Sequence, residues 1–125
     1  MFSQSNSKLF NAGLNAFQAG DYYEAHEQWE ELWSDPSLQD RHYVHGLIQV
    51  AVALFHAQQD NLNGSRSMID KALTKLTKTP DVWNSIKLND FVKASQKWKK
   101  HVHEISKTEE CNNLLNPKIE ITRHA

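Results

Sequence analysis

The chain has 125 residues, which is enough for one domain with a buried core and too few for two ordinary domains. Its 14 Lys and Arg nearly balance its 15 Asp and Glu, so the formal net charge is −1. This balance excludes a molecule-wide field that would draw the protein to nucleic acid or to an anionic membrane.

The first predicted helix covers residues 8–19 and follows a flexible N-terminus formed by residues 1–7. Leucine, alanine and phenylalanine recur in this segment at spacings of three and four, which is typical of a helix that buries one face. Gly20 ends the helix, because glycine adopts the backbone conformations that stop a helix more easily than other residues.

A second helix is predicted from Tyr22 to about Trp33. Asp21 can accept a hydrogen bond from the third residue of this helix while Glu24 reaches back, which is an acidic form of the capping box. The helix ends before Pro36, because proline disfavours a helical conformation in the residue that precedes it.

The third predicted helix begins after Ser37 and continues to about Gln58. Its middle, residues 43–55, is apolar nearly all round, which indicates a helix surrounded by the others. A cluster of turn residues follows, with Asn61 as the expected cap of a fourth helix that extends to about Lys78.

The fifth predicted helix covers residues 88–105 and is expected to have its cap near Asn89. Residues 106–125 form a polar, weakly patterned tail, so the single helical domain is assigned to residues 8–105. Within the tail, residues 117–121 alternate between apolar and polar, which suits an extended segment packed on the body.

An internal similarity at an offset of forty residues supports this layout, since Leu14 matches Leu54 and Trp29 corresponds to Ile69. Two helical hairpins of similar plan, like those stacked in tetratricopeptide arrays, explain the pattern. Two hairpins alone bury little, so the fifth helix is expected to close the open side. The predicted fold is therefore all-α, a compact bundle of about five helices.

Charge is divided unevenly along the chain. Residues 1–62 carry two basic and eight acidic side chains, whereas residues 63–125 carry twelve basic and seven acidic ones. Two solvated faces of opposite sign explain this division better than an anion-binding patch. Basic residues surround Trp98, but this tryptophan belongs to the apolar stripe of its helix, so no nucleic-acid partner is expected.

The lone cysteine, Cys111, can form no internal disulfide and is interpreted as a passive free thiol in a reducing compartment. The first residues lack the basic and apolar regions of a secretory signal, and no apolar stretch is long enough to span a bilayer. The expected location is the cytoplasm, or the plastid stroma in a plastid-bearing lineage.

Ionisable residues meet the predicted core at one place, the segment HEQWE of residues 26–30. His26 and Glu30 lie at the border of the apolar arc of the second helix, whereas Glu27 faces water. A partly buried charge is costly unless it is paired or ligated, so this pair needs an explanation that surface charges do not.

The third helix has a polar stripe of its own, formed by His42, His45, Gln49 and His56. The two ends of this stripe cannot share one ligand, because His45 and His56 are separated by about 16 Å along the helix axis. We expect the end from Gln49 to His56 to meet His26 and Glu30, since it follows the apolar stretch into the core.

Three interpretations of this cluster remain open. The side chains can form a structural hydrogen-bonded network that fixes the register of the two helices. They can line a pocket that holds a small polar ligand. Alternatively, His26, Glu30 and His56 can bind a divalent metal, Zn, Mn or Fe, that activates water for hydrolysis.

The segments GDYYEAHEQWEELW (residues 20–33) and RHYVHGLIQVAVALFH (residues 41–56) resemble the DUF309 family, a group of small helical proteins with no settled function. The likeness covers roughly residues 8–78. It departs from the family pattern mildly, at residues 60–61 and 64–65. The resemblance implies an all-helical fold and brings the family's label of predicted metal-dependent hydrolase.

The resemblance also implies a set of site residues, because the family label rests on recurrent polar positions. Carried onto this chain, these candidate binding residues are His26, Glu27, Glu30, Arg41, Gln49 and His56. The expected function is a structural or a ligand-binding or partner-binding role for this cluster, with metal-dependent hydrolysis as the enzymatic alternative.

Overall fold

The computed structural model describes residues 2–105 and 117–124, and these residues form five α-helices. The helices are α1 (Gln4–Gln18), α2 (Tyr22–Trp33), α3 (Arg41–Gln58), α4 (Leu62–Lys75) and α5 (Leu88–Glu104). The described residues contain no named strand, only isolated bridges at residues 83, 86 and 123. The prediction of a compact all-helical domain with five helices is confirmed.

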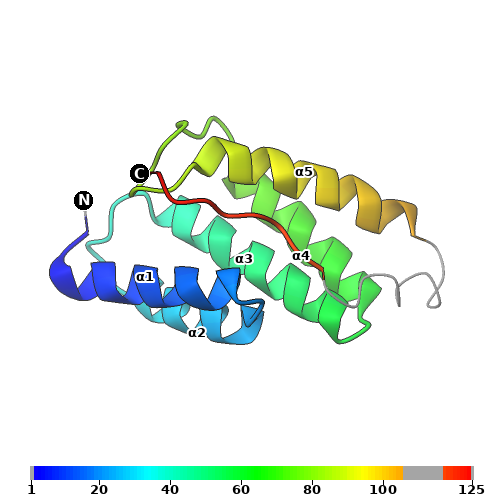
Figure 1. Ribbon diagram of the computed structural model, residues 1–125, viewed down its shortest axis with the longest axis horizontal. Coiled ribbons are helices and arrows are strands. Elements are labelled where there is room, and N and C mark those ends of the chain that lie inside the picture. The colour runs from blue at the N-terminus through cyan, green and yellow to red at the C-terminus, as the bar shows by residue number, and fades with distance from the viewer. Residues whose placement is uncertain (1, 106–116, 125) are drawn as a thin grey trace.

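Each helix packs on the next along the chain, and α3 lies in the middle because it contacts both α2 and α4 (Figure 1). More than half of its residues are buried, as its apolar middle predicted. Helix α5 packs on α4, and its Phe91 reaches Phe17 of α1 with ring centroids 5.8 Å apart. The likeness of the two hairpins to tetratricopeptide units stays a prediction.

The N-termini of α2 and α4 have the capping residues that the sequence predicted. Asp21 accepts a hydrogen bond from the amide of Glu24, and Asn61 accepts one from the amide of Gly64. Both helices therefore begin where a short polar side chain satisfies an otherwise free amide. Helix α4 ends at Lys75, three residues earlier than predicted.

Two other helix starts differ from the prediction, and α5 begins at the predicted residue but lacks the cap expected near Asn89. Helix α1 begins at Gln4 because Ser3 caps it by accepting from the amide of Asn6. Helix α3 begins only at Arg41, since Asp40 adopts a left-handed conformation with φ of 55°.

The segment of residues 117–124 lies extended between α1 and α5 (Figure 1, red). Ile119 and Ile121 are buried, and the carbonyl of Ile121 accepts a hydrogen bond from the side chain of Gln18 in α1. The amide of Lys87, next to α5, donates to the carbonyl of Thr122. The segment thus adds apolar surface to the core. Cys111 lies outside the described residues.

Candidate functional site

His26 and Glu30 form a contact on the outer part of α2, one turn apart. The Nε2 atom of His26 lies 3.2 Å from a carboxylate oxygen of Glu30, and the exposed fractions of the two side chains are 20% and 56%. The second ring nitrogen of His26 lies 3.3 Å from the carbonyl oxygen of Tyr23. The pair therefore belongs to the rim of the fold, where an ion pair contributes little to stability.

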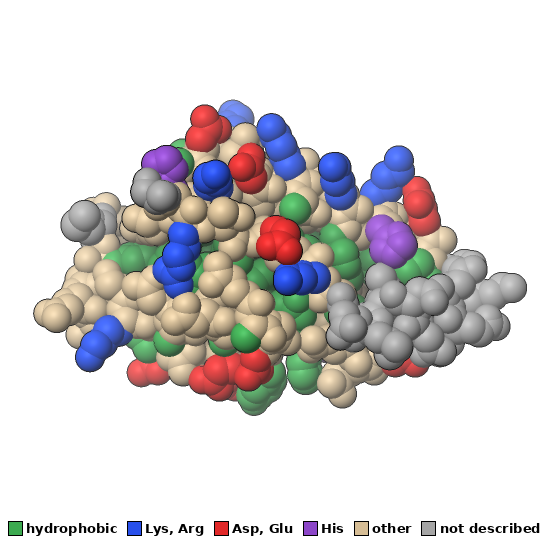
Figure 2. All heavy atoms as spheres, viewed as in Figure 1, with side chains coloured by type: hydrophobic (Ala, Val, Ile, Leu, Met, Phe, Trp, Pro, Cys, Tyr) green, Lys and Arg blue, Asp and Glu red, His purple; other side chains and the backbone are tan. Residues whose placement is uncertain are grey.

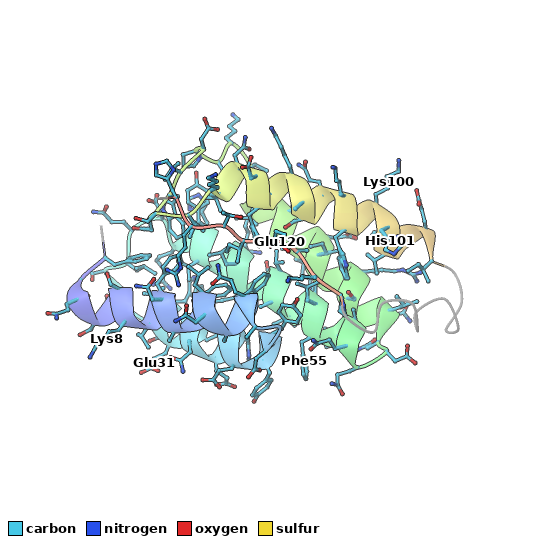
Figure 3. The ribbon with its side chains drawn as sticks, viewed as in Figure 1. Lys8, Glu31, Phe55, Lys100, His101 and Glu120 are labelled. Atoms are coloured by element: carbon cyan, nitrogen blue, oxygen red, sulfur yellow. The ribbon has the colours of Figure 1, made fainter. Side chains whose placement is uncertain are left out.

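A pocket of about 190 Å³ opens next to this pair, between α2 and α3. Its walls are almost entirely apolar and consist of Tyr22, Tyr23, His26, Val52, Phe55 and His56. We call it the Tyr23–Phe55 pocket, because these two rings lie in contact in its wall, with centroids 5.5 Å apart. Figure 3 places Phe55 at the edge of the molecule formed by α2, far from Lys100 and His101 of α5.

The structure brings only two of the six candidate residues, His26 and His56, to the walls of this pocket. His56 also contacts the side chain of Asn61, the cap of α4, at 3.2 Å. Gln49 instead faces α4, where its side-chain oxygen accepts a hydrogen bond of 3.0 Å from Lys75. The polar side chains of α3 thus contact both α2 and α4. Gln49 does not lie in the same cluster as His26 and Glu30.

Arg41 belongs to a second cluster, formed where α2 ends and α3 begins. Its guanidinium lies 4.6 Å from the ring centre of Trp33 and donates a hydrogen bond of 2.5 Å to the carbonyl of Asp35. His45 stacks on Trp33 from α3, with centroids 4.8 Å apart. These contacts hold the α2–α3 connection closed.

The pKa of His45 is lowered, first by burial and then by the positive charge of Lys75. Glu30 opposes the shift, while Arg41 adds to it. Sequence reasoning placed His45 on the polar stripe but left it out of the candidate set. The position of His45, one turn after Arg41 on the same helix, is the sequence signal that it packs with Arg41 against Trp33 at the end of α2.

Glu27 lies outside the pocket, as its place on the wet face of α2 predicted, but it acts on the pocket's rim. Hydrogen bonding to the Glu27 carboxylate raises the pKa of the exposed Tyr23 hydroxyl, and the charges of Glu24 and Glu30 act in the same direction. Three carboxylates of α2 are therefore close enough to Tyr23 to influence its ionisation.

A metal ion needs at least three suitable ligands around one point. Across residues 2–105 and 117–124, no group of three or more His, Cys, Asp or Glu is placed to hold one. His26, Glu30 and His56 therefore do not assemble as a metal-binding group, because Glu30 points along α2 toward His26 at the rim while His56 contacts the start of α4. The donor set does not fit the expected divalent metal.

None of the helices among the described residues combines the length and the apolar character needed to cross a bilayer.

A family model described as a domain of unknown function, DUF309, matches residues 10–68 of the chain. This range contains every residue of the Tyr23–Phe55 pocket and all six candidate site residues. Residues 10–68 are a DUF309 domain. The resemblance inferred from the two motifs is thereby confirmed.

Two curated relatives of this chain extend the comparison. The uncharacterized protein YpuF of Bacillus subtilis (strain 168) is 39% identical over 54 residues, which are 42% of this chain and 31% of YpuF. An uncharacterized protein of Aquifex aeolicus (strain VF5) is 26% identical over 108 residues, which are 86% of this chain and 30% of that protein. The chain thus spans less than a third of these curated relatives. No solved structure matches it.

Proposed function

We propose that this DUF309 domain is a binding domain, and that the Tyr23–Phe55 pocket holds an apolar group of a small molecule or of a protein partner. The observation that carries the proposal is an open, almost entirely apolar pocket beside an aromatic side chain that is 52% exposed. Exposed apolar surface that is gathered at a concave place is typical of a binding site.

The exposure of Tyr23 supports this proposal. Among the described residues, Tyr23 and Val82 are the exposed large hydrophobic side chains, and Tyr23 alone lines a pocket of this apolar kind. Its ring lies 5.5 Å from both Phe55 and His26, so the apolar wall continues from the surface into the pocket. The two histidines add polar atoms that can orient a bound group.

Hydrolysis receives no comparable support. A metal-dependent mechanism requires a metal that is held firmly enough to activate water, and the described residues do not provide three ligands around one point. The His26–Glu30 pair lies beside a cavity whose walls are almost entirely apolar. Binding is therefore the function that the geometry favours.

The test uses indole as an aromatic probe at millimolar concentration, followed by amide chemical shifts. We expect the largest shifts at Tyr23, Val52 and Phe55. Val52→Phe fills the pocket and is expected to abolish these shifts, whereas Val82→Phe makes the same change at an exposed position away from the pocket and should leave them intact. Shifts that are absent, or that survive in Val52→Phe, would contradict the proposal.

We also propose a reducing, cytoplasmic location. The support is the chain's single cysteine, which has no intramolecular partner for a disulfide.

A further inference from the structure

Helix α2 is acidic on its outer face and contains no lysine or arginine. The carboxylates are those of Glu24, Glu27, Glu30 and Glu31, and all four residues are exposed. Figure 2 shows acidic side chains along the lower edge of the molecule, where α2 lies in Figure 1, and several lysine and arginine side chains along the upper edge, over α5. The acidic first half of the chain thus places four exposed carboxylates on the outer face of α2.

The charge of α2 is not neutralised by the rest of the described chain. Across residues 2–105 and 117–124, the contact of Glu30 with the imidazole of His26 is the single close contact between an α2 carboxylate and a basic side chain. The lysines found in ion pairs, Lys99 and Lys118, contact Asp70 and Glu120 instead. A negative field therefore remains over the outer face of α2 and the rim of the pocket.

This arrangement works against the stability of the free helix. Glu27 is spaced three residues from both Glu24 and Glu30 and four from Glu31, and like charges at these spacings repel one another. Glu30 and Glu31 also lie in the last turn, where the helix dipole disfavours negative charge and where α2 has no basic residue. Side chains that cost stability and stay exposed are expected where a bound partner supplies the opposite charge.

We infer that the occupant of the Tyr23–Phe55 pocket is a basic protein segment, which inserts one large apolar side chain into the pocket, against the two rings, and sets its lysines or arginines against the carboxylates of α2. This inference rests on the proposed binding function and names the class of partner. The apolar anchor provides the affinity in a desolvated pocket, and the surrounding charges provide the rate of association and the specificity.

The charge of the rim disfavours the other classes of partner. Nucleic acid, an anionic membrane and an acidic peptide would all bring negative charge to Glu24, Glu27 and Glu30. A second copy of the chain offers the lysines of α5, but the apolar stripe of α5 is buried in its own core. The α5 surface of a second copy thus lacks a large apolar side chain to insert.

The test compares three synthetic peptides of equal length by fluorescence anisotropy. The first places one phenylalanine among lysines with Gly and Ser spacers, the second replaces the lysines by glutamates, and the third replaces the phenylalanine by serine. We expect the first peptide to bind at least about tenfold more tightly than either of the others, with an affinity that falls as salt rises.

Protein variants locate the contact. The double variant Glu24→Gln and Glu27→Gln is expected to weaken the first peptide about tenfold, because two exposed charges opposite the peptide are lost. Glu104→Gln removes an exposed carboxylate of α5 and serves as the matched control, with affinity unchanged. Equal losses in the double variant and in the control would overturn the inference.

The remaining outcomes separate this inference from the proposed function. If the acidic peptide binds the pocket as well as the basic one, the partner class is wrong while the pocket is still a binding site. If indole also fails to shift the pocket residues, both proposals fail. Self-association that is lost in the double variant would make a second copy the occupant, and would overturn the basic segment as partner.

Discussion

Tyr22 shows how one hydroxyl group fastens the C-terminal segment to the helices. The Tyr22 hydroxyl is buried and donates a hydrogen bond of 2.7 Å to the carbonyl of Pro117. Burial, with a smaller contribution from Glu120, raises the pKa of Tyr22 to about 12. The folded state therefore keeps the protonated phenol well beyond the pH at which the unfolded chain loses it.

Replacing Tyr22 by Phe is expected to lower the free energy of unfolding by about 1 kcal/mol, because the Pro117 carbonyl loses its donor. The stability that the raised pKa provides is complete below pH 10.0, the ordinary pKa, and is lost as pH rises toward about 12. Urea unfolding at pH 7 and near pH 11 measures both effects. Tyr23→Phe changes an exposed phenol of the same helix, and an equal loss there would contradict this explanation.

His45 predicts a pH dependence of the opposite sense. Its pKa lies below the ordinary 6.5, chiefly because of burial, so the unfolded chain takes up the proton more readily than the folded one. The contribution of His45 to stability is thus present above pH 6.5 and is lost as pH falls through the lowered pKa.

The variant His45→Phe keeps an aromatic ring on Trp33 and removes the titrating group. We expect its stability to fall less than that of the original chain between pH 7 and pH 5, as measured by thermal unfolding. His42→Phe, which changes an exposed histidine of the same helix, is the control. If the stability of His45→Phe falls with pH as steeply as that of the original chain, protonation of His45 does not contribute to the pH dependence of stability.

At the scale of elements, α1 packs directly against α2 at Gly13. A Cβ atom at this position would meet the Trp29 ring at 2.3 Å, which no real contact allows. The ring itself is fixed, because Trp29 is fully buried and its Nε1 donates to the carbonyl of Phe10 at 3.1 Å. The two helices therefore need a residue without a side chain here.

Gly13→Ala is expected to destabilise the fold by about 1–3 kcal/mol through overpacking, although alanine is the better helix former. Ala12→Gly, at the exposed neighbouring position, measures the helix propensity difference in the opposite direction on the same helix. Chemical denaturation of both variants separates the two terms. A more stable Gly13→Ala protein would mean that α1 shifts freely against α2.

The sequence predicted element identity better than element ends. Asp21 and Asn61 were identified correctly as caps because a short polar side chain before an apolar periodic run leaves a local signature. The left-handed Asp40 and the uncapped start of α5 at Leu88 left no such signature. The starts of α3 and α5 depend on how the segments that precede these helices pack against the rest of the domain.

The candidate site was predictable only in part, for a related reason. Periodicity assigns residues to a face of their own helix, and it placed His26 and His56 correctly near the α2–α3 boundary. It does not tell which neighbour covers each part of a face that two helices share. Gln49 therefore meets Lys75 of α4, a contact that only the packing of the whole bundle determines.

At the scale of the whole molecule, the core includes a segment that is far from the helices in sequence. Ile119 is 3% exposed, within the extended residues 117–124 between α1 and α5. Figure 3 shows the neighbouring Glu120 on the same segment near the centre of the view. The alternation of buried and exposed residues follows from the extended backbone, whose side chains point in opposite directions in turn.

Ile119→Ala is expected to cost about 2–4 kcal/mol, since it leaves a cavity in the shared core. Glu120→Ala, one residue along, changes an exposed side chain and should cost little. Differential scanning calorimetry compares the two variants, with a single cooperative transition expected for both. Equal melting temperatures would show that the segment contributes nothing to the core.

The outward side of α2 can accept substitutions that the central helix α3 cannot, because most residues of α3 are buried. One side of α2 is committed to the interior through Ala25, Trp29 and Leu32, which are fully buried, while the other carries the glutamates that surround the pocket. Substitutions on the outward side leave interior packing untouched. The surface around the pocket can therefore change its charge and shape while the helices of this domain keep their packing.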